Sequence, residues 1–234
     1  MSKFIRYTMS LLPYTILLFF IFLLCSLYMV FILSPADYKQ GEFVRIMYLH
    51  VPSAWISLGS YTLMAIFSFI ALVWRNVILA IISHAIAPLG LTFTSICLIT
   101  GSIWGKCTWG TWWVWDARLT SMLVLLFLYL GYISLWNFFD NEDRSMKAAS
   151  IFAIFSAINI PIIKFSVNIW TTLHQPASVL RKSGIAIDIS MLMPLFAMFA
   201  TLGLLFCILL ILRLHTLINL RKINSKLILL NNIL

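Results

Sequence analysis

Six long apolar stretches dominate this chain and leave few folds open to it. Each runs for about 20 residues with almost no charge, the length that an α-helix needs to cross the hydrocarbon core of a bilayer. Hydrophobic residues make up 62% of the 234 residues and charged residues only 10%, whereas a soluble domain carries about a quarter charged residues. We therefore predict an all-α integral membrane protein with six transmembrane helices, forming a single domain over residues 1–234. The expected spans are residues 11–33, 53–74, 78–103, 119–139, 148–165 and 189–212.

Prolines and charges near the ends of these stretches predict local departures from straight helices. Pro52 is expected in the first turn of the second helix, where its missing N–H is tolerated, and Pro88 is expected to bend the third. Pro161 and Lys164 interrupt the end of the fifth stretch. Residues 213–234 mix lysine and arginine with leucine and isoleucine, so we expect a short helix that lies on the membrane surface.

Charge and motif patterns exclude several classes of function. The net charge of +9 comes from lysines and arginines that stand singly between apolar runs and in the tail, which is typical of contacts with the lipid bilayer and not of nucleic-acid binding. The four cysteines form no CxxC pair, so no thiol redox motif is expected. The sequence has no GxxxxGK[ST] motif and therefore no ATPase site of its own. The first apolar stretch is too long for a signal peptide and is expected to be retained.

The segment 104–120, WGKCTWGTWWVWDARLT, gathers aromatic side chains between the third and fourth spans. Tryptophan favours membrane interfaces, so anchoring and packing are one explanation. Four tryptophans within seven residues exceed that need, because each exposed ring forgoes roughly 1.5–3 kcal/mol of burial. If the segment is helical, part of this set shares one face and forms a platform for a flat apolar ligand. The residues are Trp109, Trp112, Trp113 and Trp115, followed by Asp116 and Arg118; the shared face would hold Trp109, Trp112, Trp113 and Asp116.

The histidines divide into two pairs by loop parity. With six spans, the first, third and fifth loops must emerge on the same side of the membrane. His50 in the first loop and His174 in the fifth therefore share a face with the tryptophan segment, while His84 and His215 fall on the opposite side, where we expect no matching aromatic or charged neighbours. Lysines and arginines number nine on the side of the termini and seven on the tryptophan side, so the positive-inside rule favours termini inside.

Two histidines beside an aromatic platform suit haem, whose iron takes axial nitrogen ligands and whose porphyrin needs apolar contacts. His50 and His174 could ligate the iron, and Arg45 and Arg118 could pair with the propionates through their guanidinium groups. The alternatives are ordinary ones. A histidine at a helix end is often a simple hydrogen-bonding residue, both arginines could contact headgroups, and Asp116 could pair with Arg118 or complete a helix end.

These same residues resemble a known family. The string WGTWWVWDARLT is similar to the tryptophan-rich WWD signature of haem-handling proteins, and YLHVPSAW, GSIWGKCTWG and TLHQPAS resemble the CcmC family of cytochrome c maturation. The resemblance runs from about residue 35 to 176. CcmF and the CcsA-type synthases carry the signature too, but they are longer or have additional histidines within spans, so they are a poorer match.

The resemblance implies a membrane subunit, not an enzyme, for the biogenesis of c-type cytochromes. Such a subunit binds haem b at the outer face through His50, His174 and the signature from Trp109 to Arg118. It delivers the haem to a membrane-anchored haem chaperone, to which the haem becomes covalently linked. The resemblance also implies an ABC-type complex with separate ATPase and membrane subunits. The termini would lie inside, and the tryptophan segment would face the periplasm or intermembrane space from a bacterial or mitochondrial inner membrane. A transmembrane haem exporter and a structural subunit without a ligand remain as alternatives.

Overall fold

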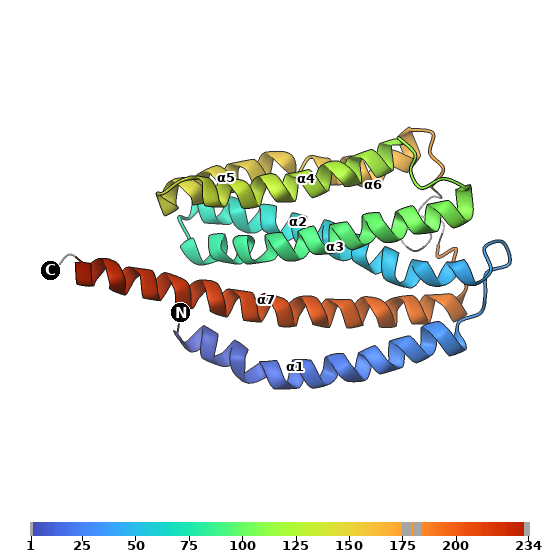
Figure 1. Cartoon of the computed structure of the whole chain (residues 1–234), viewed down its shortest axis with the longest axis horizontal. Coiled ribbons are helices and arrows are strands. Elements are labelled where there is room, and N and C mark those ends of the chain that lie inside the picture. Colours follow the sequence, from blue (N-terminus) through green and yellow to red (C-terminus); the bar gives the residue numbers. More distant parts are fainter. Residues whose placement is uncertain (1, 175–178, 180–183, 232–234) are drawn as a thin grey trace.

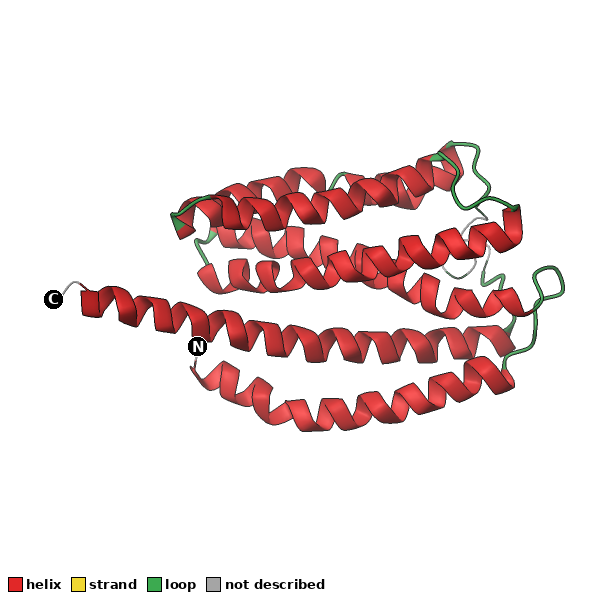
Figure 2. Ribbon diagram, viewed as in Figure 1, coloured by secondary structure: helices red, strands yellow, loops and turns green. Residues whose placement is uncertain are grey.

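The computed structural model describes residues 2–174, 179 and 184–231, and most of them are helical (Figure 2). Six helical segments are long and apolar enough to cross a membrane, and the described residues form no strand. This confirms the predicted all-α class with six spans. The helices are α1 (Ser2–Tyr28), continued by a π-helical turn (Met29–Leu33), α2 (Met47–Val73), α3 (Val77–Trp109), α4 (Ala117–Phe138), α5 (Glu142–Ser156), α6 (Asn159–Ile169) and α7 (Ile189–Asn231).

The spans lie side by side along one axis, in three layers with α1 outside them (Figure 1). The pair α2 and α3 forms the middle layer, α4 with α5 and α6 covers one side, and α7 covers the other. Outside these lies α1, which packs chiefly on α7. Both termini lie at one end of the bundle, and the loops after α1 and α3 lie at the opposite end with the chain that leads into α7 (Figure 1). Loop parity is therefore confirmed within the protein.

The second span begins earlier than predicted. A 3₁₀ turn (Glu42–Ile46) leads directly into α2, which starts at Met47. Pro52 is therefore inside the helix and not in its first turn, so the prediction was wrong on this point. A proline inside a helix cannot donate a hydrogen bond to the carbonyl four residues earlier, and its ring crowds that carbonyl. Because of this extension, His50 lies on a rigid helical turn and not in a loop.

The fifth span is two helices. α5 ends at Ser156, two turn residues follow, and α6 begins at Asn159 with Pro161 in its first turn, a position where proline lacks no helical partner. The predicted interruption is real, but it comes earlier than the end of the stretch. The buried Asn159 amide donates to the Ser121 carbonyl at 2.9 Å, which joins the start of α6 to α4.

The sixth span also differs from the prediction. α7 continues without a break from the last apolar stretch to Asn231, so the expected separate surface helix does not form. After Gly203 the described helix contains neither glycine nor proline, and helices kink sharply at such residues or at inserted side chains. Arg221 of α7 reaches Glu142 at the start of α5, with 3.3 Å between Nη2 and Oε2.

Fully buried tyrosines fill the centre of the bundle. The Tyr129 hydroxyl donates to the Ser57 carbonyl at 2.8 Å, and the Tyr61 ring packs edge-on against Tyr129 with 4.9 Å between centroids. A buried hydroxyl is costly unless it is hydrogen-bonded, so this bond fixes the position of Tyr129 between α2 and α4. Gly90 of α3 makes the arrangement possible, because a Cβ there would lie 2.2 Å from the Tyr129 hydroxyl oxygen.

We expect Gly90→Ala to destabilise the protein by about 1–3 kcal/mol, the usual cost of overpacking a core. Gly59→Ala is the matched control, because no atom lies within 4 Å of a Cβ at Gly59 and alanine favours a helix interior. Thermal unfolding of the detergent-solubilised variants measures the difference. Equal stability of the two variants would contradict the packing of Tyr129 against α3.

Candidate functional site

The tryptophan segment is not one helix. α3 ends at Trp109 because Gly110 adopts φ = +79°, a left-handed conformation that closes many helices. Residues 110–116 are irregular, and Asp116 then starts α4 by accepting a hydrogen bond from the Leu119 amide at 2.8 Å. The expectation that three tryptophans and Asp116 share one helical face was therefore wrong. A glycine terminator and an aspartate N-cap within seven residues leave no room for a helix between them.

The four tryptophans take two different environments. Trp113 turns inward and lines a hollow in the bundle, and Trp109 packs edge-on against His174 with 4.8 Å between ring centroids. Trp112 and Trp115 point outward, with 57% and 76% of their surface exposed. Two rings therefore belong to the interior of the site, and two surround it on the outside.

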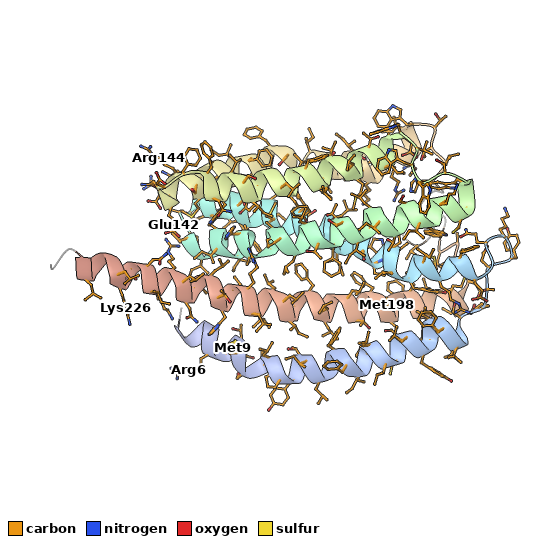
Figure 3. The ribbon with its side chains drawn as sticks, in the orientation of Figure 1. Arg6, Met9, Glu142, Arg144, Met198 and Lys226 are labelled. Carbon is orange, nitrogen blue, oxygen red and sulfur yellow. The ribbon has the colours of Figure 1, made fainter. Side chains whose placement is uncertain are left out.

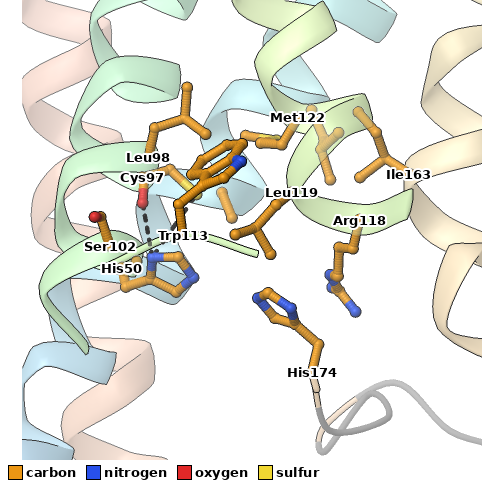
Figure 4. Close-up of a pocket in the computed structure, with 13 residues that line it drawn as sticks. His50, Cys97, Leu98, Ser102, Trp113, Arg118, Leu119, Met122, Ile163 and His174 are labelled. Atoms are coloured by element: carbon orange, nitrogen blue, oxygen red, sulfur yellow. Dashed lines mark hydrogen bonds between the residues drawn. The ribbon is translucent and has the colours of Figure 1, made fainter. Parts of the chain in front are cut away.

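Two adjacent hollows lie at the loop end of the bundle, and His50, Gly101 and His174 line both of them. The first, which we call the apolar hollow, holds about 560 Å³ of open space among α2, α3, α4 and α6. The second, the tryptophan hollow, holds about 470 Å³ and faces Trp104 and Trp109. In Figure 4 the side chains of His50, His174, Trp113 and Arg118 point toward one common space.

His50 is held in a defined orientation and tautomer by α3. Its Nδ1 lies 3.0 Å from the Cys97 carbonyl oxygen, which can only accept, so Nδ1 carries the proton and donates. The other ring nitrogen, Nε2, keeps a free lone pair. Gly101 allows this close approach, since a Cβ there would meet the His50 Cε1 at 2.7 Å.

His174 is oriented in the same way by a carboxylate. Its Nδ1 lies 3.4 Å from Asp116 Oδ2, and Asp116 also accepts a hydrogen bond from the Thr172 hydroxyl. A histidine that donates one ring N–H to a carboxylate or carbonyl is the usual arrangement of a metal ligand, because the donor bond fixes the ring and leaves Nε2 free. The two histidines thus present equivalent nitrogens to the shared hollows.

Burial is the main reason that His174 is neutral near pH 7. Burial and the positive charge of Arg118 lower the pKa of His174, and Asp116 only partly opposes them. Burial alone would raise the pKa of Asp116, but hydrogen bonds from the Leu119 amide and the Thr172 hydroxyl, together with His174, hold that pKa below its ordinary value. The site therefore pairs an ionised carboxylate with a neutral imidazole, the form that ligates a metal.

One predicted residue lies elsewhere. Arg45 lines neither hollow; its guanidinium donates to the Val30 carbonyl and to the Glu42 carboxylate, which ties α1 to the start of α2. The structure brings the other predicted residues together at the end of the bundle. Asp116 lines neither hollow but contacts His174, which lines both. The QPAS residues that follow His174 in the TLHQPAS motif lie outside the described residues.

Sequence reasoning missed two residues of the site. Trp104 packs edge-on against His50 with 5.7 Å between centroids and donates its ring N–H to Gln40 Oε1 at 2.7 Å. Gly101 is needed for the position of His50. The spacing of Gly101 and Gly105 could have indicated close packing here, because small residues four apart let helices approach each other in membranes.

The expectation for His84 also needs correction. This ring stacks on Trp136 of α4, with 4.2 Å between centroids and 7° between planes, and it interacts electrostatically with Arg213. An aromatic and a charged neighbour are therefore present, brought by helices that are distant in sequence. His84 lines neither hollow.

Comparisons with known proteins all point to one family. Residues 1–229 match the family described as heme exporter protein C, CcmC. The chain is 46% identical over 205 residues to heme exporter protein C of Bradyrhizobium diazoefficiens, a match that covers 88% of this chain and 78% of the relative. It is 52% identical over 162 residues to heme exporter protein C of Escherichia coli K12, covering 69% of this chain and 65% of that relative, just under two thirds. A putative cytochrome c biosynthesis ccmC-like mitochondrial protein of Marchantia polymorpha is 48% identical over 176 residues, covering 75% of this chain and 74% of the relative.

We expect two neutralising substitutions to move the pKa of His174 in opposite directions. Asp116→Asn removes the charge that raises it, so the pKa falls further, while Arg118→Gln removes a charge that lowers it, so the pKa rises. Asparagine also caps helices well, so α4 is preserved. Nuclear magnetic resonance titration of ring-labelled histidine in the haem-free protein measures both. Shifts of the same sign in the two variants would contradict this arrangement of charges.

The same pKa gives a dependence of stability on pH. The folded state disfavours protonation of His174, so below about pH 6.5 the unfolded chain binds more protons there. The contribution of a neutral His174 is therefore complete above that pH and is lost as the pH falls toward the lower folded pKa. Chemical unfolding of wild type and His174→Gln between pH 7 and pH 5 should show a steeper loss in the wild type. Parallel curves would contradict the prediction.

Proposed function

Because the chain belongs to the heme exporter protein C (CcmC) family, we propose that it binds haem b at the outer membrane face and hands it on for cytochrome c maturation. The observation that carries the proposal is the pair His50 and His174. Each has Nδ1 occupied by a neighbouring acceptor, and both line the same hollows. Two neutral imidazoles with free Nε2 atoms are the donor set that haem iron takes.

The walls of the apolar hollow suit the rest of the haem molecule. Ala54, Leu58 and Met122 offer apolar contact to a porphyrin. Arg118 can pair with a propionate through two parallel hydrogen bonds. Among the described residues, Trp113 Nε1 is buried without a hydrogen-bond partner, and a carboxylate oxygen of the ligand would satisfy it. Arg45 is engaged with Glu42 and Val30, so we assign the propionate role to Arg118.

In this proposal the protein acts by positioning. The histidines hold the iron, Trp109 and Trp113 contact the buried side of the porphyrin, and Trp112 and Trp115 lie outside, where they can contact a partner. Holding a reactant in the right orientation can contribute several kcal/mol without an acid or base from the protein. The recipient in this proposal is a membrane-anchored haem chaperone. Relatives named heme exporter and cytochrome c biosynthesis proteins support a role in cytochrome c maturation.

The same proposal includes the location of the protein, its orientation in the membrane and its partner chains. The protein is a multi-pass membrane subunit, and both bacterial and mitochondrial relatives occur. We place the termini inside and the tryptophan segment in the periplasm or intermembrane space, as the distribution of basic residues favours. The ATPase and further membrane subunits of an ABC-type complex would be separate chains.

Loss of either histidine should weaken haem binding. For His50→Ala and His174→Ala we expect a weaker or shifted Soret band and roughly tenfold lower haem retention or more, because one axial ligand is lost. His215→Ala is the control, since this residue lies toward the other end of the bundle and contacts Asn219. Visible spectra of the purified proteins from haem-replete cells provide the measurement. Normal spectra in both histidine variants would refute the assignment of the ligands.

The two groups of tryptophans should separate binding from delivery. We expect Trp113→Ala to lower haem retention roughly tenfold, since an interior wall is lost. A double variant, Trp112→Ala with Trp115→Ala, should keep its haem but yield less cytochrome c, because these rings are exposed. Haem content and cytochrome c yield are measured on the same cells. If neither these alanine variants nor the corresponding phenylalanine variants change haem content or cytochrome c yield, the alternative of a structural subunit without a ligand is favoured.

A further inference from the structure

The end of α7 carries an apolar stripe that the bundle does not cover. Leu220, Ile223, Leu227 and Leu230 follow one another at intervals of three, four and three residues, the spacing of one helix face and of a coiled-coil seam. All four are more than half exposed, at 51%, 54%, 52% and 58% of their surface. In Figure 1 this part of α7 extends past the ends of the other helices.

The stripe faces away from α3 and α5. Leu214 and Ile218 are buried against the start of α3, and Arg221 pairs with Glu142 of α5. At 100° per residue, Leu220, Ile223 and Leu227 lie on the side of the helix opposite to these three. The side of α7 that the bundle uses and the side that bears the stripe are therefore different.

The stripe continues the seam that α1 fills deeper in the bundle. Thr201 of α7 donates a hydrogen bond to Ser26 of α1 at 3.1 Å, and Met198 contacts the same serine. Leu220 and Ile223 lie 22 residues after Met198 and Thr201, which is about six helical turns, so they share that face. α7 extends beyond the first residues of α1 (Figure 1), and its face is left without a helix to cover it.

The charge on this part of α7 selects the partner. Residues 213–234 contain four lysines and arginines and no acidic residue. Arg221 already pairs with a carboxylate, but Lys222 and Lys226 are exposed, and no acidic side chain of the described chain pairs with them. Figure 3 shows Lys226 on the projecting part of α7. At 100° per residue, these two lysines flank the stripe on one side, where charged residues of a coiled coil determine the choice of partner.

We propose that this face, formed by Leu220, Ile223, Leu227 and Leu230 with Lys222 and Lys226, docks an acidic amphipathic helix of another protein at the end of the bundle that carries the termini. A second copy of the chain would bring lysines against lysines, which is unfavourable. The apolar span of α7 runs over 39 residues to Leu227, about 58 Å of helix and roughly twice the thickness of the hydrocarbon core, so the end of α7 extends beyond the bilayer. A membrane surface is disfavoured, because α7 has no break after its span and Arg221 pairs with Glu142, so the helix leaves along the bundle axis. The inference does not depend on haem binding.

Photo-cross-linking of the full chain in cells that assemble c-type cytochromes tests the proposal. Leu227 is replaced by p-benzoylphenylalanine, and Ser225, exposed on the opposite side of the same turn, is the control position. Mass spectrometry then identifies the linked peptide. We expect Leu227 to link to a helical segment with a leucine-rich face and flanking aspartate or glutamate, and Ser225 to give little of this product.

Charge reversal provides the second arm. Lys222→Glu with Lys226→Glu should lower the yield of that product about tenfold, whereas Lys39→Glu, at an exposed lysine in the loop after α1, should leave it unchanged. Unchanged thermal unfolding establishes that the variants fold. A product with lipid, with a second copy of the chain or with a segment lacking acidic residues, or no product at all, would overturn the proposal.

Discussion

The bilayer satisfies no backbone hydrogen bond, and the whole architecture depends on that constraint. Within the hydrocarbon, N–H and C=O groups must pair inside helices, so the six apolar stretches have one available structure. Some polar side chains in the interior pair with backbone carbonyls, as when Tyr129 donates to the Ser57 carbonyl and Asn159 to that of Ser121. Apart from the two turn residues between α5 and α6, irregular backbone in the described part of the chain lies at the ends of the spans, and the proposed site is built there.

Precise placement of the proposed site comes from two rigid supports of different kinds. His50 lies on the first turn of α2 and is held by a carbonyl of α3, at a position that only a glycine at residue 101 leaves free. His174 lies after α6 and is held by Asp116, which also begins α4. Helix packing therefore fixes the imidazole of His50. The carboxylate of Asp116, which also caps α4, fixes the imidazole of His174. In our proposal the haem lies between them, so its geometry depends on α2, α3 and α4 together.

The two ends of the bundle differ in what they present. The loop end presents hollows, tryptophans and histidines, which suits a small flat ligand. The end with the termini presents a helix that extends past its neighbours, with an apolar stripe and exposed lysines, which suits another protein. In our two proposals the subunit docks an acidic helix on one side of the membrane and handles haem and its recipient on the other, and the continuous helix α7 connects the two sides.

The sequence by itself determined the class, the number of spans, and which loops share a side, because these follow from hydrophobic length and from parity. It also indicated the residues of the site as a set, since tryptophan clusters and interfacial histidines are visible in one dimension. Only the tertiary structure decided how these residues are arranged. Gly110 ends α3, so the tryptophans do not share one helical face. Arg45 pairs with Glu42, and Asp116 orients His174. Likewise Trp136 and Arg213 reach His84 from distant helices. Such contacts depend on how helices pack side by side, which a pattern along one helix does not contain.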